Sequence, residues 1–533
     1  MAAHRTAPLT WGQRNIWLDH QQLPPSARHE LNFSVDYTPP EGSTAQNLRR
    51  ALDALVRRYE SLRSTYGWVP GQGAVQRVEP PGPVPVLVHE TTEHPGVPAS
   101  EVLAKAGSEP FDLDARGPIR ATVITTDGVP TLMVFVGHHI AVDDWSLERM
   151  RAEYAELHGD LLARRPVRLS PVRHHPVDLA AYEASPAGRA AADRAADYWS
   201  RTLAEAPSDL WSARRVPAGG PAHSVTASST AVLAAARELA SRHQVWPSLV
   251  HTAAFTAVAA ACTGAAGVPF LAYASNRDLP LHADLMSCLF LPVVVHTDCS
   301  DTPAFDEIVR RTAKSCGEAM DHSHAEYDRV LELTALESAG RATPLRLATA
   351  VNYLQYPDKT RGGTRSTLTH NAAPTGWAAL EDDFYLRIGE WSDCTVTTLY
   401  ASGDIMTPET AERFLRAMES LLVTAAATDA PLPLSEIADM AAFPPPPLSP
   451  AVAPPPPDPP DLQAVSALAT AVASANNLAD VDLAQPYVTT GGRILAIPHV
   501  RALLADTGWT APSLRTFTTP APLSSLAALL TRT

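Results

Sequence analysis

The sequence has 533 residues, of which 45% are hydrophobic and 19% are charged, a composition typical of a soluble globular protein. This length exceeds what one ordinary hydrophobic core supports, so we expect two or three domains. The formal net charge of −15 and the scattered basic residues argue against nucleic acid and against an anionic membrane surface as partners.

The cysteines and the apolar segments indicate a cytoplasmic protein. There are five cysteines, an odd number, and no C-x-x-C pair, which favours reduced thiols. The first 22 residues contain no apolar stretch typical of a secretory signal. The longest apolar helix candidate, residues 248–263, is interrupted by His251, Thr252 and Thr256, so we expect it in a protein core and not in a membrane.

The pattern of residues 1–180 predicts a mixed α/β domain. Helices are predicted at 9–18 and at 48–62, the second capped by Ser43 or Thr44. Strands are predicted at 32–37, 119–126 and 131–136, with a turn at 127–130 between the last two.

The segment after the last of these strands is the first candidate site. Residues 137–146 read Gly-His-His-Ile-Ala-Val-Asp-Asp-Trp-Ser, and a helical pattern follows. Polar side chains on a loop at a strand end are often catalytic, although two adjacent histidines alone are explained equally well as surface residues. Asp143 lies four residues beyond His139, close enough to orient an imidazole or to brace the loop. A second pair, His174 and His175, is expected in a solvated loop.

Residues 181–442 predict a second α/β domain. A helix at 248–262 leads into a strand at 270–274, and Arg277 follows that strand. Residues 289–295 are almost continuously apolar, as in a strand buried on both faces. Further strands are predicted at 350–354, 383–387 and 396–399, and an amphipathic helix at 407–425 closes the domain.

The composition changes abruptly at residues 443–460, which are rich in proline and predict an extended, semi-rigid linker. A small last domain follows at 461–533. Helical patterns occur in it at 462–472, 495–504 and 523–530.

Residues 137–146 resemble the H-H-x-x-x-D-G-W-S motif of nonribosomal peptide synthetase condensation domains. Four more segments resemble that family in order: 9–18 its S-x-A-Q-x-R-L-W opening, 57–66 (with Arg63) its R-H-E-x-L-R-T-x-F, 178–182 weakly its Y-x-D-Y, and 272–277 its G-x-x-x-A-N-R. The order and spacing hold over residues 8–438, so the chain resembles a free-standing condensation domain.

The resemblance implies an α/β (α+β) fold with a central tunnel. Two lobes, each like chloramphenicol acetyltransferase, form a V, and the two predicted α/β domains correspond to them. The histidine motif lies at the centre of the tunnel, and a carrier-bound donor and acceptor enter from opposite faces.

The resemblance also implies roles for residues of the motifs. His139 acts as a base, or as an orienting hydrogen-bond partner, when an amine attacks a thioester. His138 and Asp143 complete the catalytic motif and are expected to be mainly structural, with Asp143 in a bidentate pair with Arg277 of the other lobe. The supporting residues of these segments are Asp144, Trp145 and Arg63.

Two departures from the family pattern bear on the site. Asp144 replaces the usual glycine: it is tolerated without consequence, it recognises a cationic acceptor, or it weakens the base by favouring imidazolium and raising the pKa of His139. Phe290-Leu291-Pro292-Val293 replaces the family's F-V-N-T, so donor contacts there do not carry over.

The last domain resembles a peptidyl carrier protein over about 55 residues. Ile494 stands where the carrier signature G-G-x-S-L has its serine, and isoleucine has no hydroxyl for phosphopantetheine. The resemblance therefore implies that this chain binds no cofactor. The domain is expected to dock on a partner, to stabilise the main domain, or to be the vestige of a lost module.

We expect a condensation enzyme of nonribosomal peptide biosynthesis that forms an amide, or an ester, from a thioester on a partner acyl or peptidyl carrier protein. The acceptor is carrier-bound or a small free amine, and no metal is expected. The alternatives are a non-catalytic recruitment protein and a soluble CoA-dependent acyltransferase of similar fold, although the late D-F-G-W-G segment of the latter is missing. No nucleophile elbow, P-loop or adenylate-forming motif is present.

Overall fold

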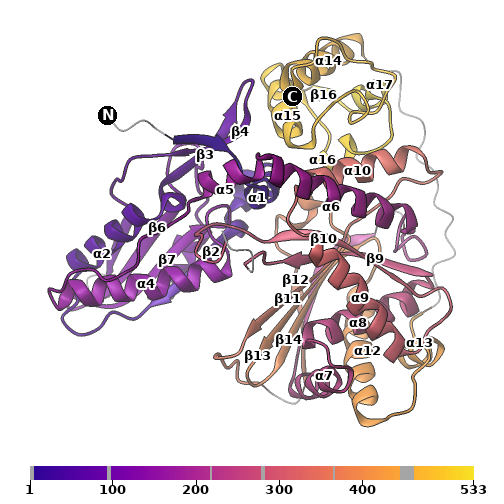
Figure 1. Ribbon diagram of the computed structural model, residues 1–533, viewed down its shortest axis with the longest axis horizontal. Helices are drawn as coiled ribbons and strands as arrows, with labels where there is room; N and C mark the ends of the chain where they lie inside the picture. Colours follow the sequence, from indigo (N-terminus) through magenta and orange to yellow (C-terminus); the bar gives the residue numbers. More distant parts are fainter. Residues whose placement is uncertain are drawn as a thin grey trace.

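The computed structural model describes residues 5–92, 98–216, 219–277, 282–363, 366–444 and 461–532. Two lobes diverge from a shared centre, and a smaller C-terminal unit lies beside them (Figure 1). From residue 445 onward the predicted proline-rich linker lies outside the described residues.

The first lobe is built on a four-stranded sheet of order β2-β7-β6-β5. Its strands are β2 (Asn32–Tyr37), β5 (Val86–Glu90), β6 (Ile119–Thr126) and β7 (Val129–His138). Its helices are α2 (Ala45–Arg58), α3 (Ala99–Ser108) and α4 (Asp144–Leu162). Leu52 of α2, Phe135 of β7 and Tyr154 of α4 belong to one buried apolar cluster, which fixes α4 against the sheet.

A three-stranded sheet of order β1-β4-β3 stands beside this lobe. Its strands are β1 (Arg5–Pro8), β3 (Ser64–Val69) and β4 (Gly73–Val78), and the nearby helices are α1 (Trp11–Gln22), η1 (Pro25–Leu31) and η2 (Glu60–Arg63). Helix α1 runs against the second lobe, because a Cβ on Gly12 would lie only 2.4 Å from the Cys288 carbonyl oxygen. Gly12 therefore permits a backbone approach between the lobes.

The second lobe is built on a seven-stranded sheet of order β10-β9-β11-β13-β14-β8-β12. Its strands are β8 (Gly220–Ser229), β9 (Gly267–Ala274), β10 (Leu291–Asp298), β11 (Thr349–Tyr356), β12 (Thr367–Ala372), β13 (Phe384–Trp391) and β14 (Thr395–Gly403). Val293 and Val295 of β10 belong to one core cluster and Val294 belongs to another, so this strand is buried on both faces as its apolar run predicts.

Helices cover both faces of this sheet. The larger core contains residues of α7 (Thr230–His243), α8 (Pro247–Thr263), α9 (Phe305–Asp321), α12 (Pro408–Ala427) and α13 (Leu434–Ala441). The opposite face carries α6 (Pro186–Glu205) and α10 (Tyr327–Ala339). The remaining helices are α5 (Pro176–Glu183), inside which the predicted boundary at 180 falls, and α11 (Trp377–Leu380).

Residues 461–532 form the C-terminal unit, drawn in yellow in Figure 1. Its elements are α14 (Leu462–Asn476), η3 (Ile494–Ala496), α15 (Ile497–Asp506), β15 (Trp509–Thr510), α16 (Leu514–Phe517), α17 (Leu523–Ala527) and β16 (Thr531–Arg532). Tyr487, Ile497 and Phe517 are fully buried in an apolar cluster of this unit. That cluster also contains Leu18 of α1, so the unit packs on the rest of the chain.

The structure differs from the sequence-based expectations around the histidine pairs. Strand β7 continues through His138, because it pairs with β2 as far as Asn32, and helix α4 begins at Asp144. Only residues 139–143 therefore form the loop between strand and helix. The second pair does lie in a loop, directly before α5, but both histidines are partly buried, and the backbone N–H of His175 donates to the Asp178 carboxylate.

No single helix in the described part of the chain is long and apolar enough to cross a membrane. Helices α7 and α8, bent by 103° at a short break, pass that test together by length and composition only.

Candidate active site

The loop between β7 and α4 is anchored at both ends. Ile140, Ala141 and Val142 are fully buried, so the loop is part of the core of the first lobe. Asp143 caps α4, because its carboxylate accepts the Ser146 N–H at 2.8 Å. The polar side chains of the loop are therefore held between a strand end and a capped helix.

Within the pair His138–His139, the contacts of His138 give it a structural role. Its ring is fully buried, and its Nδ1 accepts the Ile140 N–H at 3.1 Å. Because Nδ1 accepts, Nε2 carries the proton and donates to Nδ1 of His20 at 3.1 Å. Burial lowers the pKa of His138 well below its ordinary value and that of His20 to about 3, so both imidazoles are neutral.

His139 lies at the cavity wall. Its Nδ1–H donates to the Val142 carbonyl at 2.8 Å, which leaves a lone pair on Nε2. Nε2 has no hydrogen-bond partner among the described residues, and the residue lines a cavity between the lobes. The ring is held between Phe33, edge-on at 4.3 Å between centroids, and Phe290, stacked at 4.9 Å.

Burial also controls the protonation of His139. Desolvation lowers its pKa below the ordinary value near 6.5, and the Val142 carbonyl, Asp143 and Asp144 offset only part of this effect. Asp144 therefore raises the pKa of His139, as expected, but by less than desolvation lowers it. The imidazole is neutral at neutral pH and able to accept a proton.

Asp143 and Arg277 meet across the two lobes. Nη2 of Arg277 donates to both carboxylate oxygens of Asp143, at 2.8 and 2.6 Å, and also to Ser146 Oγ and the Ser287 carbonyl. The contact uses one guanidinium nitrogen and not the two-nitrogen fork that the family resemblance implied, because Nη1 donates to the carbonyls of His282 and Leu285. The pair ties the loop of the first lobe to the segment after β9.

Asp144 and Trp145 begin helix α4 and line the cavity. Asp144 has helical backbone, so the position does not use the conformational freedom of glycine. Trp145 is 40% exposed, and the guanidinium groups of Arg277 and Arg149 lie 4.2 Å and 5.3 Å from its ring centroid.

The cavity has a volume of about 900 Å³ and belongs to all three parts of the chain. The first lobe contributes His139 and Asp144, and the second contributes Tyr273, Phe290 and Arg387. The C-terminal unit contributes four lining residues, namely Leu514, Arg515, Thr518 and Thr519. This volume lies within the range that holds a drug-sized ligand.

Two further residues singled out by sequence lie apart from His139. Arg63 does not line the cavity: it donates to the Glu79 carbonyl and lies 3.7 Å from Glu60, so it braces η2. Ile494 is fully buried at the start of η3, and its N–H lies 3.5 Å from Glu332 Oε1 of α10.

Sequence reasoning missed several residues of the site. Some residues lie outside every sequence motif, and only the fold brings them to the loop or the cavity. They are His20, Phe33, Asp19 and Asp382. Burial and the nearness of Asp382 raise the pKa of Asp19 to about 7, and burial raises that of Asp382 to about 6. Phe290 was noticed only as a departure, although it stacks on His139.

The described residues do not bring three His, Cys, Asp or Glu side chains together in a geometry that could hold a metal ion. The cavity instead presents the His139 imidazole, carboxylates and guanidinium groups. Such a wall suits proton transfer and the positioning of polar reactants.

The sequence and the fold have relatives among known proteins. Residues 3–440 match the family described as Condensation domain, and the chain belongs to that family. A solved structure titled "Molecular basis for condensation domain-mediated chain release from the enacyloxin polyketide synthase" superposes with a TM-score of 0.59 at 20% identity, covering 85% of each chain. The two-lobed α/β fold of condensation domains is thus the fold of this protein.

Relatives by sequence are large synthetases. Chondramide synthase cmdD of Chondromyces crocatus is 26% identical over 354 residues, which are 63% of this chain and 9% of the synthase. Phosphinothricin tripeptide synthetase PhsB of Streptomyces viridochromogenes is 26% identical over 357 residues, which are 64% of this chain and 29% of the synthetase. The chain therefore spans less than a third of the length of either relative.

Proposed function

We propose that this protein is a condensation enzyme of nonribosomal peptide biosynthesis that transfers an acyl or aminoacyl group from a thioester to an amine. The observation that carries the proposal is the state of His139. Its Nδ1–H is held by the Val142 carbonyl, Nε2 is free among the described residues, and burial keeps the ring neutral. A neutral, oriented imidazole at a cavity between two lobes is suited to accept a proton from an attacking amine.

The reaction balances with the groups present. The amine nitrogen attacks the thioester carbonyl carbon, and Nε2 of His139 takes the proton that the nitrogen loses. The C–S bond then breaks, and the proton passes from His139 to the departing thiolate, which leaves as a thiol. The products are an amide and a thiol, and His139 is neutral again. An alcohol in place of the amine gives an ester by the same steps.

The neighbouring side chains act as positioning residues in this proposal. Asp143 holds the loop through Arg277 and the helix cap, and His138 holds it through Ile140 and His20. The aromatic rings of Phe33 and Phe290 prevent the imidazole from turning away from the cavity. Fixed orientation of a proton acceptor preserves the near-attack geometry on which the rate depends.

The donor is proposed to arrive on the phosphopantetheine arm of a separate acyl or peptidyl carrier protein, in the cytoplasm. A tethered thioester fits a cavity that opens between lobes, because the arm can reach an interior imidazole while the carrier stays outside. CoA thioesters and carrier thioesters share this chemistry, so the test below includes both.

The experiment compares wild-type protein with His139→Ala and with His370→Ala, a half-exposed histidine paired with Glu412 away from the cavity. Candidate carriers loaded with acyl groups are incubated with a panel of primary amines, and intact-protein mass spectrometry follows loss of the acyl group. His139→Ala is expected to lose about 10²–10⁴ in rate with its fold kept, whereas His370→Ala is expected to match wild type.

Full activity of His139→Ala would overturn the role of His139. Turnover with acyl-CoA in place of the loaded carrier would favour the CoA-dependent alternative. Transfer by neither donor, combined with stable carrier binding, would favour a recruitment protein without catalysis.

A further inference from the structure

The C-terminal unit is docked on both lobes through its η3–α15 segment. Arg493 Nε donates to Glu332 Oε1 of α10 at 3.0 Å, and the Ile494 N–H faces the same oxygen at 3.5 Å. Glu332 is only 4% exposed, so this contact is made at a buried carboxylate. Glu332 also pairs with Arg329 at 2.9 Å and the Arg493 side chain is 62% exposed, so this ion pair makes a modest contribution to the docking.

Apolar contacts at the same place connect the docked unit to the cavity. Leu18 of α1 is 2% exposed and belongs to the cluster that contains Ile494 and Leu468, and Leu331 of α10 packs against that cluster. Leu18 and Leu331 also line the cavity that contains His139. The buried Ile494, at the position that resembles the arm-bearing serine of a carrier, therefore belongs to the apolar cluster that joins the unit to the cavity wall.

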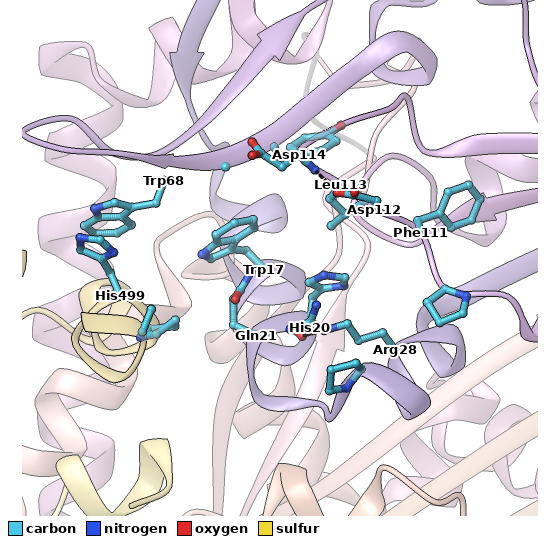
Figure 2. A pocket seen from close by; sticks show the side chains of 16 residues that line it. Trp17, His20, Gln21, Arg28, Trp68, Phe111, Asp112, Leu113, Asp114 and His499 are labelled. Atoms are coloured by element: carbon cyan, nitrogen blue, oxygen red, sulfur yellow. Dashed lines mark hydrogen bonds between the residues drawn. The ribbon is translucent and has the colours of Figure 1, made fainter. Parts of the chain in front are cut away.

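A second contact lies on the first lobe. The rings of Trp68 and His499 stack with centroids 4.8 Å apart and planes at 24°. Figure 2 shows this stack at one side of a separate pocket of about 590 Å³, which is bounded by α1, by the segment around Asp112 and by α15. The docked unit thus touches α10 of the second lobe and Trp68 of the first, and it bridges the V.

The unit is also part of the wall around the reactants. Leu514, Arg515 and Thr518 line the cavity from α16 and its end. Arg515 is only partly exposed, and it offsets part of the rise that burial gives to the pKa of Asp382, which lines the same cavity. Removing the unit would leave Asp382 without this cation.

We propose that the C-terminal unit acts as a stopper: it permanently covers one of the two faces at which carrier proteins would dock. The enzyme would then join a carrier-bound donor to a small free acceptor. The proposal rests on the proposed function. The resemblance to condensation domains implies two carriers that enter from opposite faces, and we assign the surface of α1, α10 and Trp68 to one of them. Here that surface is in contact with a unit that has isoleucine at the position resembling the arm attachment site. One face remains for the donor carrier, and a cavity of about 900 Å³ has room for an acyl group with a small amine.

The test locks the unit in place in the full chain. Trp68→Cys with His499→Cys puts two thiols in the stacked contact, where a short bismaleimide can join them. All five native cysteines are buried, so the engineered pair is the reactive one. The single variants, capped with N-ethylmaleimide, are the matched controls, and intact mass gives the cross-linked fraction.

Turnover is measured with an acyl-loaded carrier as donor and with two forms of the same acceptors. Amino-acid amides serve as free acceptors, and the same amino acids loaded on a second carrier serve as tethered ones. The locked enzyme is expected to keep its rate with free acceptors within about twofold and to make no product from tethered acceptors. A rate that falls about tenfold or more on locking, or product from tethered acceptors before locking, would overturn the stopper.

Hydrogen exchange on the full chain tests the docking without any activity. The amides of η3 and α15 are expected to be strongly protected in wild type and to exchange faster in Ile494→Asp, which buries a carboxylate beside Glu332. Fast exchange of these amides in the wild type would contradict the docking. If no acceptor gives product in any of these reactions while the amides of η3 and α15 remain protected, the proposed function fails, and the proposal of a small free acceptor fails with it. The docking of the C-terminal unit would still be supported by the protection.

Discussion

The contact between Asp143 and Arg277 gives the most direct test of how the loop is held. The change is Asp143→Ala. It removes the acceptor of the Ser146 N–H at 2.8 Å, of the Leu289 N–H at 3.2 Å, and of Arg277 Nη2 at 2.8 and 2.6 Å. Both side chains are about nine-tenths buried, so little water replaces the carboxylate.

The cost follows from these contacts. Loss of the helix cap alone costs about 1 kcal/mol, and leaving a buried charge without its partner costs about 3–5 kcal/mol. Arg277 keeps four acceptors, from Ser146 Oγ and the carbonyls of His282, Leu285 and Ser287, but loses its carboxylate. Since the contributions overlap, we expect about 3–5 kcal/mol in total, and about 1–3 kcal/mol for Asp143→Asn, which keeps one acceptor oxygen.

The assay is urea unfolding followed by tryptophan fluorescence, with the free energy of the first transition as the quantity compared. The matched control is Asp284→Ala, which removes another ion pair of helix α4. Arg149 Nη1 of this helix lies 2.8 Å from Asp284, whose side chain is 59% exposed. This exposed pair is expected to contribute less than about 1 kcal/mol. A loss below about 1 kcal/mol for Asp143→Ala, or a loss equal to that of the control, would refute the reasoning.

Three more predictions concern the surroundings of His139. Because burial lowers the pKa of His139, the acid limb that His139 gives to kcat/KM is expected below pH 6.5 after correction for protonation of the amine acceptor. Asp144→Asn removes a carboxylate that raises this pKa, so its acid limb is expected at lower pH than that of the wild type, and a limb at higher pH would contradict the assignment. His20→Leu leaves the His138 Nε2–H buried without an acceptor and is expected to cost about 1–3 kcal/mol in urea unfolding, whereas unchanged stability would rule out that hydrogen bond. Phe290→Leu removes the ring stacked on His139, a contact worth about 0.5–1.5 kcal/mol. We therefore expect a kcat lower by up to about tenfold with normal stability. A wild-type kcat would show that the ring does not orient the imidazole.

The local part of the site was predictable because it is encoded by neighbours in sequence. The apolar run before His138 and the helical pattern after Trp145 predict the strand and the helix, and the apolar run before Val295 predicts a strand buried on both faces. The ends were less predictable, because pairing with β2 extends β7 by two residues beyond its apolar pattern. Tertiary pairing decided this boundary.

The tertiary part of the site could not be read from residue patterns. His20 meets His138 across 118 positions, and Arg515 reaches the cavity from a unit beyond the proline-rich segment. Neither residue carries a signal of its own, because the sequence does not distinguish a buried histidine from an exposed one, or an arginine that lines a cavity from one at the surface. The Asp143–Arg277 contact was expected from family resemblance alone, since nothing in the spacing of the two residues relates them.

Asp144 influences both the protonation of His139 and the charge of the cavity wall. It begins α4 with helical backbone, so replacing glycine there imposes no backbone cost. It raises the pKa of His139, but desolvation is the larger effect, so the imidazole remains an acceptor and the carboxylate does not disable it. What remains is a negative charge on the cavity wall, opposed by Arg387, whose pKa it helps to raise. Beside it, Asp19 and Asp382, whose pKa values burial raises to about 7 and about 6, add carboxyl groups that form hydrogen bonds. Although arginines such as Arg387 and Arg515 line the same cavity, this part of its wall suits an acceptor that donates hydrogen bonds, such as an amine.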